Sequence, residues 1–348
     1  MTAYERAHTS DTCTPKMAGY QRAPGTYFFL AFVAVALAAY YAQVLHPPPD
    51  NKEFRTRYGP TACIAGASEG MGFAWAEYFA ARGLNVIMIA RHKEPLEKAA
   101  ANLRKAYGAK VETRVFDLAS DGVVDFAEQL FNENANIGTL IYNAAYTGAT
   151  KGYFTSDTLE MAHTAVDVNV KGVLSLVHPF LKARQGLLRN IAKRDQMAGH
   201  SMPDSGSGGG LVLMSSMAGL VGSAHISTYA ATKAWDTAFA VGLYEELRGG
   251  NSASPGIDVL SCIAGATTTP NYLKRALKTR SRKIEQPPDE VVAECAASLG
   301  VRPTCATGWV NWFGQFSMMR LVPTWAAVRI MSDGTRTTTK LDDVPQKA

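Results

Sequence analysis

The sequence predicts an α/β protein in which a doubly wound parallel sheet lies between two layers of helices. Three observations support this fold. Short apolar runs alternate with amphipathic stretches from residue 60 onward, a glycine-rich turn follows the first run, and 47% of the 348 residues are hydrophobic against 19% charged. Repeated strand–helix units produce parallel strands that are covered on both faces. We therefore expect a three-layer α/β/α sandwich over residues 60–303.

Residues 27–45, which precede this domain, form an uncharged apolar stretch. A helix of that length extends about 28 Å, close to the roughly 30 Å hydrocarbon core of a bilayer. Prolines at 47–49 end the helix. We expect a transmembrane anchor, with an N-terminal tail at 1–26 and a linker at 46–59. A cleaved signal peptide is the alternative, because Ala36-Leu37-Ala38 fits a small-x-small cleavage site.

Charge and cysteine usage indicate the environment of the domain. The basic residues that flank the anchor favour a main domain facing the cytosol, on the endoplasmic reticulum or another internal membrane; a cleaved signal would give a secreted protein. The five cysteines include no C-x-x-C pair, and Cys63 and Cys262 lie in apolar runs as small buried hydrophobes. We expect a reducing compartment, no metal and, without a basic run interleaved with aromatics, no nucleic-acid partner.

The first predicted strand, 61–65, leads into the glycine-rich turn. This turn reads Gly66-Ala-Ser68-Glu-Gly70-Met71-Gly72, and a helical apolar pattern follows it as far as Gly83. Such a turn lets backbone N–H groups and a helix N-terminus approach a pyrophosphate. By itself, it could equally be a tight strand–helix connection.

The same alternation continues along the chain. We expect strands at 85–90, 110–116 and 139–142, helices at 94–107 and 122–133, and a long helix at 157–183. Asp117-Leu118 follows the third strand, Asn143-Ala144-Ala145 follows the fourth, and the long helix carries Asn169. Residues 185–210 contain MPDSGSGGG and are expected to form a mobile surface insertion.

The stretch from Ser216 to Lys233 combines a hydroxyl, a phenol and an amine. Tyr229 and Lys233 are four residues apart, so they share one face of a helix. The ammonium favours the charged phenolate, which suits this tyrosine to acid–base work near neutral pH. Ser216 ends the apolar run 211–214 and would place its hydroxyl at the mouth of the same site. Tyr-x-x-x-Lys alone is weak, because it also occurs by composition on ordinary helices.

The chain after Lys233 continues the helix to about Gly249, then predicts a strand at 257–263, a turn at 264–270 and a helix at 289–299. Residues 274–283 hold six basic side chains, either a solvated helix face or a patch for an anionic group. A C-terminal helical extension over 304–331 carries an aromatic stripe, interpreted as core packing or as a membrane-facing lid over a lipophilic pocket. A flexible tail over 332–348 follows. The stripe consists of Trp309, Trp312, Phe313 and Phe316.

Six motifs in this order resemble the short-chain dehydrogenase/reductase family, over residues 60 to about 300. They are the G-x-x-x-G-x-G turn, the two strand ends at 117–118 and 143–145, the Asn169 helix, the Ser216–Tyr229–Lys233 set and the turn at 264–270. Ala145 and Ala264 stand where the family usually has glycine and proline. The resemblance implies a Rossmann-type fold and hydride transfer between a nicotinamide cofactor and a carbonyl or alcohol.

The resemblance also implies roles for the matched residues. Tyr229 is the acid in reduction and the base in oxidation, Ser216 polarises the carbonyl and Lys233 binds the nicotinamide ribose. Asn169 holds a water between Lys233 and solvent, or alternatively is a helix-bend residue bonded to backbone. The expected cofactor contacts are Gly66, Ser68, Gly70, Met71, Gly72, Arg91, Asp117, Leu118, Asn143, Ala144, Ala145, Tyr229, Lys233, Thr267 and Thr269.

The anchor and the extended C-terminus most resemble the hydroxysteroid dehydrogenase and 3-ketoacyl-CoA reductase branch, which implies a lipophilic ketone as substrate. NAD-dependent oxidation of an alcohol on the same fold is one alternative, and a non-catalytic dinucleotide sensor or scaffold is another. Family members commonly pair through the long helices here placed at 157–183 and 226–249, so we expect a homodimer.

The end of the second strand bears on the choice between NAD(H) and NADP(H). NAD-specific proteins place an acid there, which accepts hydrogen bonds from the ribose hydroxyls. Here Ala90 occupies that place, and the guanidinium of Arg91 can pair with a 2′-phosphate. Glu69 in the glycine turn opposes this, although a solvent-facing carboxylate is screened. The sequence therefore predicts NADP(H).

Overall fold

The computed structural model describes residues 51–148, 154–156, 158–197, 208–247, 256–275 and 285–338, together with a few positions between 27 and 38. It divides into two units, Met1–Tyr41 and Ala42–Ala348. In the first unit, the described positions from Tyr27 to Ala38 are helical. Most of the predicted anchor lies outside the described residues, and no helix among those described is long and apolar enough to cross a bilayer.

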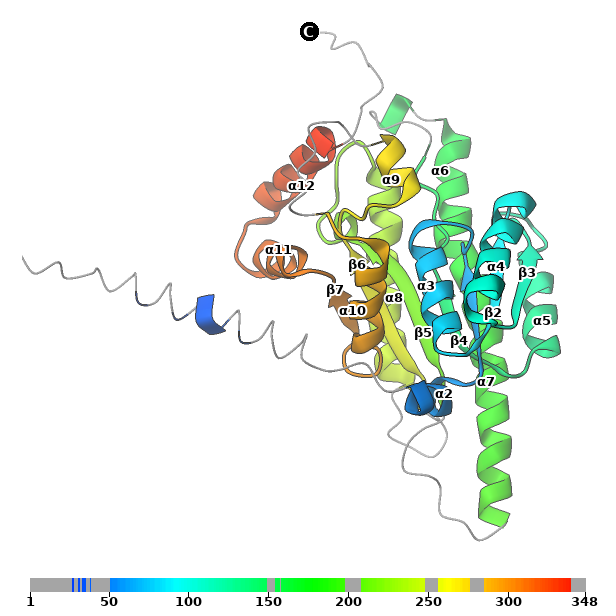
Figure 1. The fold of residues 1–348 in the computed structure, drawn as a ribbon. Coiled ribbons are helices and arrows are strands. Elements are labelled where there is room, and N and C mark those ends of the chain that lie inside the picture. The colour runs from blue at the N-terminus through cyan, green and yellow to red at the C-terminus, as the bar shows by residue number, and fades with distance from the viewer. Residues whose placement is uncertain are drawn as a thin grey trace, which may run out of the picture. The chain divides into compact units, whose positions relative to one another are not determined.

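The second unit is built on a seven-stranded sheet whose neighbouring strands are all parallel (Figure 1). The strand order is β3-β2-β1-β4-β5-β6-β7. Because the order reverses between β1 and β4, a crevice forms outside the carboxyl ends of these two strands. The strands are β1 Thr61–Ala65, β2 Asn85–Ala90, β3 Val111–Val115, β4 Ile137–Tyr142, β5 Gly210–Ser216, β6 Asp258–Ala264 and β7 Thr304–Ala306.

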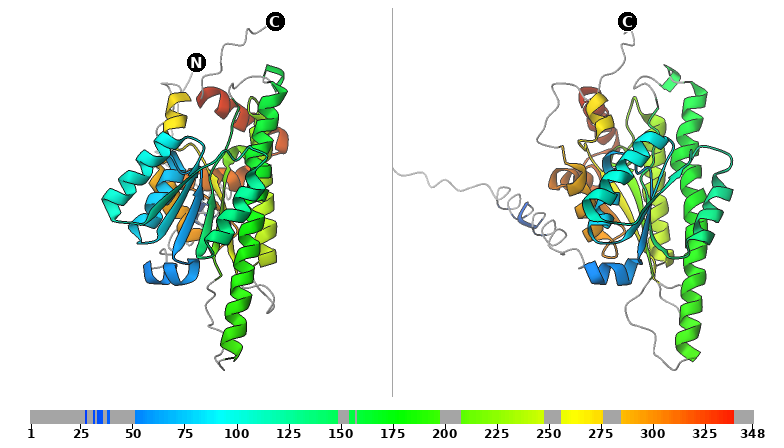
Figure 2. Two further views of the ribbon diagram at one scale, coloured as in Figure 1. Left: turned by 90° about the vertical axis from the view of Figure 1, so that its right-hand side faces the viewer. Right: turned by 45° about the vertical axis from the view of Figure 1, so that its right-hand side comes forward.

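Helices cover both faces of this sheet, as the views in Figure 2 show. One face packs against α3, α4 and α10, and the other packs against α5, α7 and α8. The predicted Rossmann-type three-layer fold is therefore confirmed. The helices of this unit are α2 Asn51–Tyr58, α3 Gly70–Ala81, α4 Lys93–Tyr107, α5 Val123–Glu133, α6 Leu159–Val166, α7 Gly172–Met197, α8 Ser227–Leu247, α9 Pro270–Arg275, α10 Pro288–Ser298, α11 Trp309–Arg320 and α12 Thr324–Thr338.

The central strand β1 shows why the alternation of the sequence produces this sandwich. All five of its residues are buried. Ala62 and Ile64 belong to the core under α3, whereas Cys63 and Ala65 belong to the core on the opposite face. Side chains alternate along a strand, so a strand covered on both faces is a continuous apolar run.

The predicted linker at 46–59 is not entirely a linker. Residues 51–58 form α2, in which Phe54 and Tyr58 are fully buried. The Tyr58 hydroxyl donates to Asp258 Oδ2 at 3.0 Å and to the Leu299 carbonyl at 3.1 Å. The folded unit therefore begins about nine residues earlier than predicted, because two aromatic side chains fix a polar-looking segment onto the sheet.

The predicted long helix is broken, and it extends further than expected. A π-helical turn, η2 Asp167–Lys171, separates α6 from α7. Helix α7 then continues to Met197, so the prediction of a surface loop from 185 onward is wrong as far as residue 197. Leu188 is buried there, and Arg184 Nε donates to the Gly208 carbonyl at 3.1 Å. Residues 198–207 lie outside the described residues.

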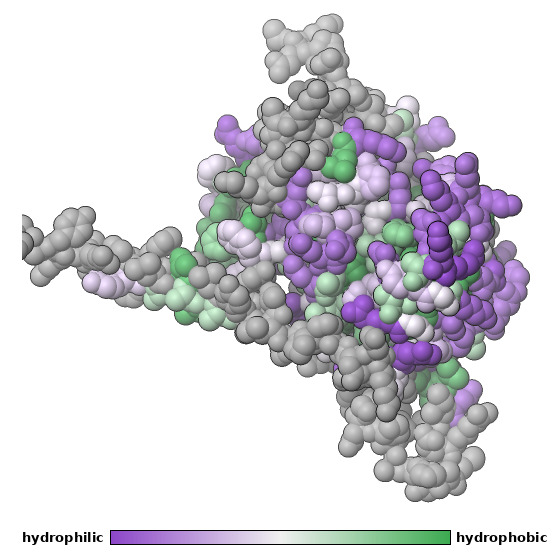
Figure 3. Space-filling view, in the orientation of Figure 1, coloured by the Kyte–Doolittle hydropathy of each residue, from purple (hydrophilic) through white to green (hydrophobic). Residues whose placement is uncertain are grey.

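The C-terminal extension contains two helices, α11 and α12. The aromatic stripe is not core, since no residue of α11 is buried and Trp309 is 61% exposed. Figure 3 shows hydrophobic residues at the surface in this region. The predicted flexible tail is also wrong as far as Thr338, because α12 includes 332–338 and Ser332 is buried. Of the basic stretch 274–283, only the first two residues are described, at the end of α9.

Two cysteines are bonded, contrary to the prediction. Cys262 of β6 and Cys295 of α10 form a disulfide between elements that pack directly on each other. Cys63 is a buried free thiol, as expected. The sequence shows no short cysteine motif because the partners are 33 residues apart. Disulfides persist in oxidising environments, so the cysteines no longer support a reducing compartment.

Candidate active site

A cleft of about 360 Å³ lies at the carboxyl edge of the sheet, where the strand order reverses. It is lined by the glycine-rich turn, by the ends of β2, β3 and β4, and by the turn that precedes α9. The structure thus brings together most of the predicted cofactor contacts. Those that line the cleft are Gly66, Ser68, Gly70, Met71, Arg91, Asp117, Leu118, Asn143, Ala144, Ala145 and Thr269.

The glycine-rich turn has no room for side chains at two of its positions. A Cβ on Gly66 would lie 2.7 Å from the Ala144 backbone, and Gly66 has φ of +80°. A Cβ on Gly72 would lie 1.9 Å from the Gly66 carbonyl oxygen. Asn143 Nδ2 donates to that same oxygen at 2.9 Å and fixes the turn to the end of β4. The bare backbone and the N-terminus of α3 therefore form a cradle that fits a pyrophosphate.

Two exposed charged residues, Glu69 and Arg91, line this cleft. Arg91 follows β2 directly and is exposed. Glu69 is also exposed, and its Oε1 accepts a hydrogen bond of 2.8 Å from Asn271 Nδ2 on α9. Because Glu69 faces solvent and is held by Asn271, its charge is screened more than that of a buried carboxylate.

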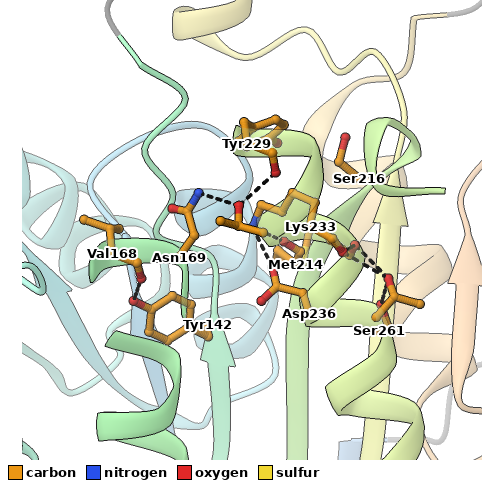
Figure 4. A network of polar contacts seen from close by, with 12 residues as sticks. Tyr142, Val168, Asn169, Met214, Ser216, Tyr229, Lys233, Asp236 and Ser261 are labelled. Carbon is orange, nitrogen blue, oxygen red and sulfur yellow. Dashed lines mark hydrogen bonds and ion pairs between the residues drawn. The ribbon is translucent and has the colours of Figure 1, made fainter. Parts of the chain in front are cut away.

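Helix α8 presents Tyr229 and Lys233 on one face, as their spacing predicts (Figure 4). Lys233 Nζ lies 5.9 Å from the centroid of the Tyr229 ring. Lys233 is 2% exposed, and its ammonium donates to the Met214 carbonyl at 2.7 Å and to Asp236 Oδ2 at 2.8 Å. The lysine is therefore held in a buried ion pair beneath the tyrosine.

Asp236 is the main feature of this site that the motif reasoning missed. Its Oδ1 is buried and has no hydrogen-bond partner among the described residues, while its Oδ2 is paired with Lys233. Burial lowers the pKa of Lys233, but the charge of Asp236, the charge of Tyr229 and the hydrogen bond to Asp236 together raise that pKa above its ordinary value. The spacing Lys-x-x-Asp was a visible signal, since i and i+3 share a helix face.

Ser216 ends β5 beside the tyrosine. Its Oγ accepts a hydrogen bond of 3.2 Å from the Ala218 amide, which leaves the hydroxyl proton for an acceptor in the site. The neighbouring Ser215 Oγ donates to the Lys233 carbonyl at 2.7 Å and accepts from Thr237 Oγ1 at 2.8 Å. These hydroxyls fix α8 against β5, so the distance between serine and tyrosine is set by secondary structure rather than by a free loop.

Asn169 lies in the π-helical turn and is fully buried. Its Oδ1 accepts from the Tyr146 amide at 2.7 Å, and its Nδ2 donates to the Tyr146 carbonyl and to Thr232 Oγ1, both at 2.9 Å. The side chain therefore ties the end of β4 and helix α8 together, and it makes no hydrogen bond to Lys233. This matches the helix-bend alternative, and the proton-relay role stays a prediction.

The two threonines of the turn after β6 lie differently. Thr269 lines the cleft, and its side chain lies 3.1 Å from where a Gly70 Cβ would be. Thr267 is 4% exposed, does not line the cleft and donates to the Gly265 carbonyl at 3.2 Å. Of the predicted cofactor contacts, Gly72, Thr267, Tyr229 and Lys233 are the four that do not line the cleft.

A second cavity, of about 20 Å³, has Tyr229 in its wall and shares Thr147 with the first cleft. Its walls come from the segment after β4, from α6 and from the residues that lead into α8. His225 is one of them and has φ of +68°, a left-handed conformation that is unusual for a residue with a side chain. The lining residues are Thr147, Gly148, Phe154, Met161, Ala162, His225, Ile226, Ser227, Thr228 and Tyr229.

Comparison with known proteins finds a family model and relatives that match this chain. A family model described as short chain dehydrogenase matches residues 60–279. The 7beta-hydroxysteroid dehydrogenase of Collinsella aerofaciens is 29% identical over 263 residues, which cover 74% of this chain and 89% of that protein. A human protein named inactive hydroxysteroid dehydrogenase-like protein 1 is 26% identical over 77% of this chain and 74% of its own length.

Solved structures share the fold as well. A short-chain dehydrogenase from Sphingobium yanoikuyae in complex with NADPH is 26% identical and superimposes with a TM-score of 0.55. The match covers 83% of this chain and 98% of that one.

Proposed function

The chain belongs to the short-chain dehydrogenase family, and on that premise we propose that it is an oxidoreductase that reduces a carbonyl to an alcohol with NADPH. The observation that carries this proposal is that Tyr229 lies in the wall of the cavity lined by His225, that this cavity shares Thr147 with the glycine-lined cleft, and that the buried Lys233 lies beside the same tyrosine ring. A proton donor in that position can serve a substrate on one side and a cofactor on the other.

The chain's own residues would divide the work as follows. Tyr229 donates a proton to the carbonyl oxygen, and the Ser216 hydroxyl donates a hydrogen bond to the same oxygen and stabilises the charge that develops on it. Lys233 keeps a positive charge beneath the tyrosine, and Asp236 offsets part of its field. A bound nicotinamide supplies the hydride.

The cleft fits a phosphorylated dinucleotide. Gly66 and Gly72 let the turn that carries the cleft's backbone N–H groups pack tightly, because a Cβ at Gly66 would overlap the Ala144 backbone and one at Gly72 would overlap the Gly66 carbonyl. Arg91 offers a fork of donors for a 2′-phosphate, and Ala90 leaves no carboxylate to repel it. The relative from Sphingobium yanoikuyae binds NADPH. These observations support NADP(H) over NAD(H).

The substrate class we favour is a lipophilic ketone, such as a steroid, a 3-ketoacyl compound or a related lipid. The walls of the cavity beside Tyr229 include the apolar side chains of Phe154, Met161 and Ile226 among hydroxyl-bearing residues. The bacterial relative is named for a hydroxysteroid. A site with few charged groups on the substrate side suits a ligand that is mostly hydrocarbon.

A turnover screen tests this function. Purified full-length protein is offered NADPH with steroid ketones, acyl-CoA ketones, retinoids and small aldehydes, and absorbance at 340 nm is followed. We expect consumption with at least one lipophilic ketone and little with small aldehydes. The proposal would be contradicted if the protein binds NADPH but reduces none of the carbonyl compounds in the panel.

A non-catalytic dinucleotide sensor is the second candidate, because one relative is named inactive and because Lys233 is paired with Asp236. NAD-dependent alcohol oxidation is a third, and it differs in the direction of turnover and in cofactor preference. A sensor would bind NADPH tightly but consume none. An NAD-dependent alcohol dehydrogenase would reduce NAD with an alcohol faster than it oxidises NADPH with a ketone.

We also propose that residues 27–45 anchor the protein in an internal membrane; the Cys262–Cys295 disulfide does not support the cytosol-facing orientation that the flanking basic residues predict. The support is the uncharged apolar length of this segment. Full-length protein should resist carbonate extraction, and a truncated protein beginning at Asn51 should lose that resistance. A mature N-terminus near Ala39 would show a cleaved signal instead.

We propose, finally, that the protein forms a homodimer through the helices that follow β4 and β5. In this chain these are α7 and α8, which lie together on one face of the sheet. Light scattering in detergent should give twice the monomer mass at micromolar concentration. A monomer under those conditions would contradict this assembly.

A further inference from the structure

The segment between Ser216 and α8 forms one wall of the cavity beside Tyr229. His225 lies four residues before Tyr229 and lines the same cavity. Among the residues that the structure describes, it is the one non-glycine residue with a positive φ, at +68°. A backbone held in this sparsely populated region persists only where its surroundings determine it, and such positions cluster at functional sites.

The last helix of the described chain supplies those surroundings. Ser332 of α12 accepts a hydrogen bond of 2.9 Å from the Ala224 amide, next to His225. The hydroxyls of Thr335 and Ser223 lie 2.7 Å apart and form a second hydrogen bond. Ser332 and Ser223 are 8% and 5% exposed, so both contacts are shielded from water. Two residues one turn apart on α12 thus hold two consecutive residues of the segment.

Helix α11 reaches the same part of the site. A Cβ at Gly314 would lie 3.5 Å from the Met217 Cε, and Met217 follows Ser216 directly. Ala327 of α12 is fully buried. The C-terminal extension therefore packs against the segment that leads from the catalytic serine to the catalytic helix, although Met217 and Gly314 are 97 residues apart in sequence.

We propose that α12 is a positioning element of the substrate site, in which Ser332 and Thr335 hold the turn at 223–225 so that His225 walls the cavity beside Tyr229. The inference rests on the proposed carbonyl reduction and deepens it. Without the two hydrogen bonds the turn relaxes from its left-handed conformation and the wall retreats. A bulky substrate that reaches this wall loses contacts, whereas a small one that occupies only the space at Tyr229 does not.

The kinetic test compares a steroid ketone with cyclohexanone as a small probe. Ser332→Ala and Thr335→Val should each raise the KM for the steroid ketone roughly three- to tenfold, which corresponds to the loss of one shielded hydrogen bond. The KM for NADPH and the turnover of cyclohexanone should stay within twofold. Thr335→Ser keeps a hydroxyl and should restore the wild-type KM. Ile330→Ala, on an exposed position of the same helix, is the matched control.

Amide hydrogen exchange tests the contact itself without activity. Exchange in the peptide spanning 221–226 should be faster in Ser332→Ala than in the wild type and unchanged in Ile330→Ala. Unchanged exchange in every variant overturns the proposal, and so does faster exchange without a rise in the KM for the steroid ketone. If wild-type protein reduces neither ketone nor any other carbonyl, the proposed function fails and the substrate role fails with it, while exchange still decides whether α12 holds the turn.

Discussion

The disulfide between Cys262 and Cys295 gives the sharpest prediction about stability. Replacing both cysteines with alanine removes the link between β6 and α10 but changes no residue placed at the cleft. The bond closes a segment with a sequence separation of 33. In the chain-entropy description, cross-linking a loop of that length stabilises the fold by about 3.7 kcal/mol at 25 °C. For a domain of this size, the loss should lower Tm by roughly 7–15 °C.

Two measurements check this prediction. Thiol labelling in denaturant without reductant, followed by peptide mapping, should find Cys63 and Cys305 free and Cys262 and Cys295 unlabelled in the wild type. Guanidinium unfolding should show the lower midpoint in the double variant. Cys305→Ala calibrates the cost of removing one buried thiol, because Cys305 is free and packs in the same core. Labelled Cys262 and Cys295 in the wild type, or equal midpoints for the double and the single variant, would refute the reasoning.

Three further predictions concern the cleft and the buried pair. Arg91→Ala should raise the KM for NADPH roughly 10- to 100-fold, the range of a lost charge-assisted hydrogen bond, and should change the KM for NADH little. Equal KM values for NADPH and NADH in the wild type would contradict NADP(H) preference. Gly72→Ala should weaken NADPH binding at least tenfold in a titration, because its Cβ overlaps the Gly66 carbonyl, whereas Gly122→Ala has open space and should bind normally. Asp236→Ala should cost about 3–5 kcal/mol of unfolding free energy, since it leaves a buried charge unpaired. The raised pKa of Lys233 means that the pair stabilises the fold fully below the ordinary lysine pKa and that this stabilisation is lost as pH rises through the higher folded value. In Asp236→Ala, burial alone lowers the Lys233 pKa, so the loss of stability at alkaline pH should begin at a lower pH than in the wild type. Identical dependence of stability on pH in the two proteins would contradict this.

The elements that the sequence predicts well are those whose local pattern and tertiary environment agree. The strands at 61–65 and 85–90 were predicted to the residue, because central parallel strands are continuous apolar runs with turn residues at both ends. The glycine spacing and the Tyr229–Lys233 pair are local as well, so their places on a turn and on one helix face follow from the chain alone.

The structural predictions that are wrong concern segments whose structure depends on contacts with residues distant in sequence. Residues 185–197 read as a loop because of the glycines and serines that follow them, yet the helix continues to Met197. The polar end of α12 is ordered by hydrogen bonds to Ser223 and Ala224, more than a hundred residues away. A disulfide between β6 and α10 cannot be read from spacing.

In the site, sequence reasoning found the residues of the motif but not their environment. It did not find Asp236, whose carboxylate takes the lysine ammonium, although the i, i+3 spacing was visible. It did not find His225 either, because a left-handed backbone at histidine has no signal in composition or periodicity.

The most direct measurement of the central claim is the pair of rates for wild-type protein and Tyr229→Phe with NADPH and a steroid ketone, alongside NADPH binding by fluorescence titration. The variant removes one hydroxyl and little volume, so NADPH should bind with a Kd within about twofold of the wild type. The loss of a general acid should lower kcat by about 100-fold or more. A variant that keeps most of its activity, or a wild type that binds NADPH and reduces no ketone, would contradict proton donation by Tyr229.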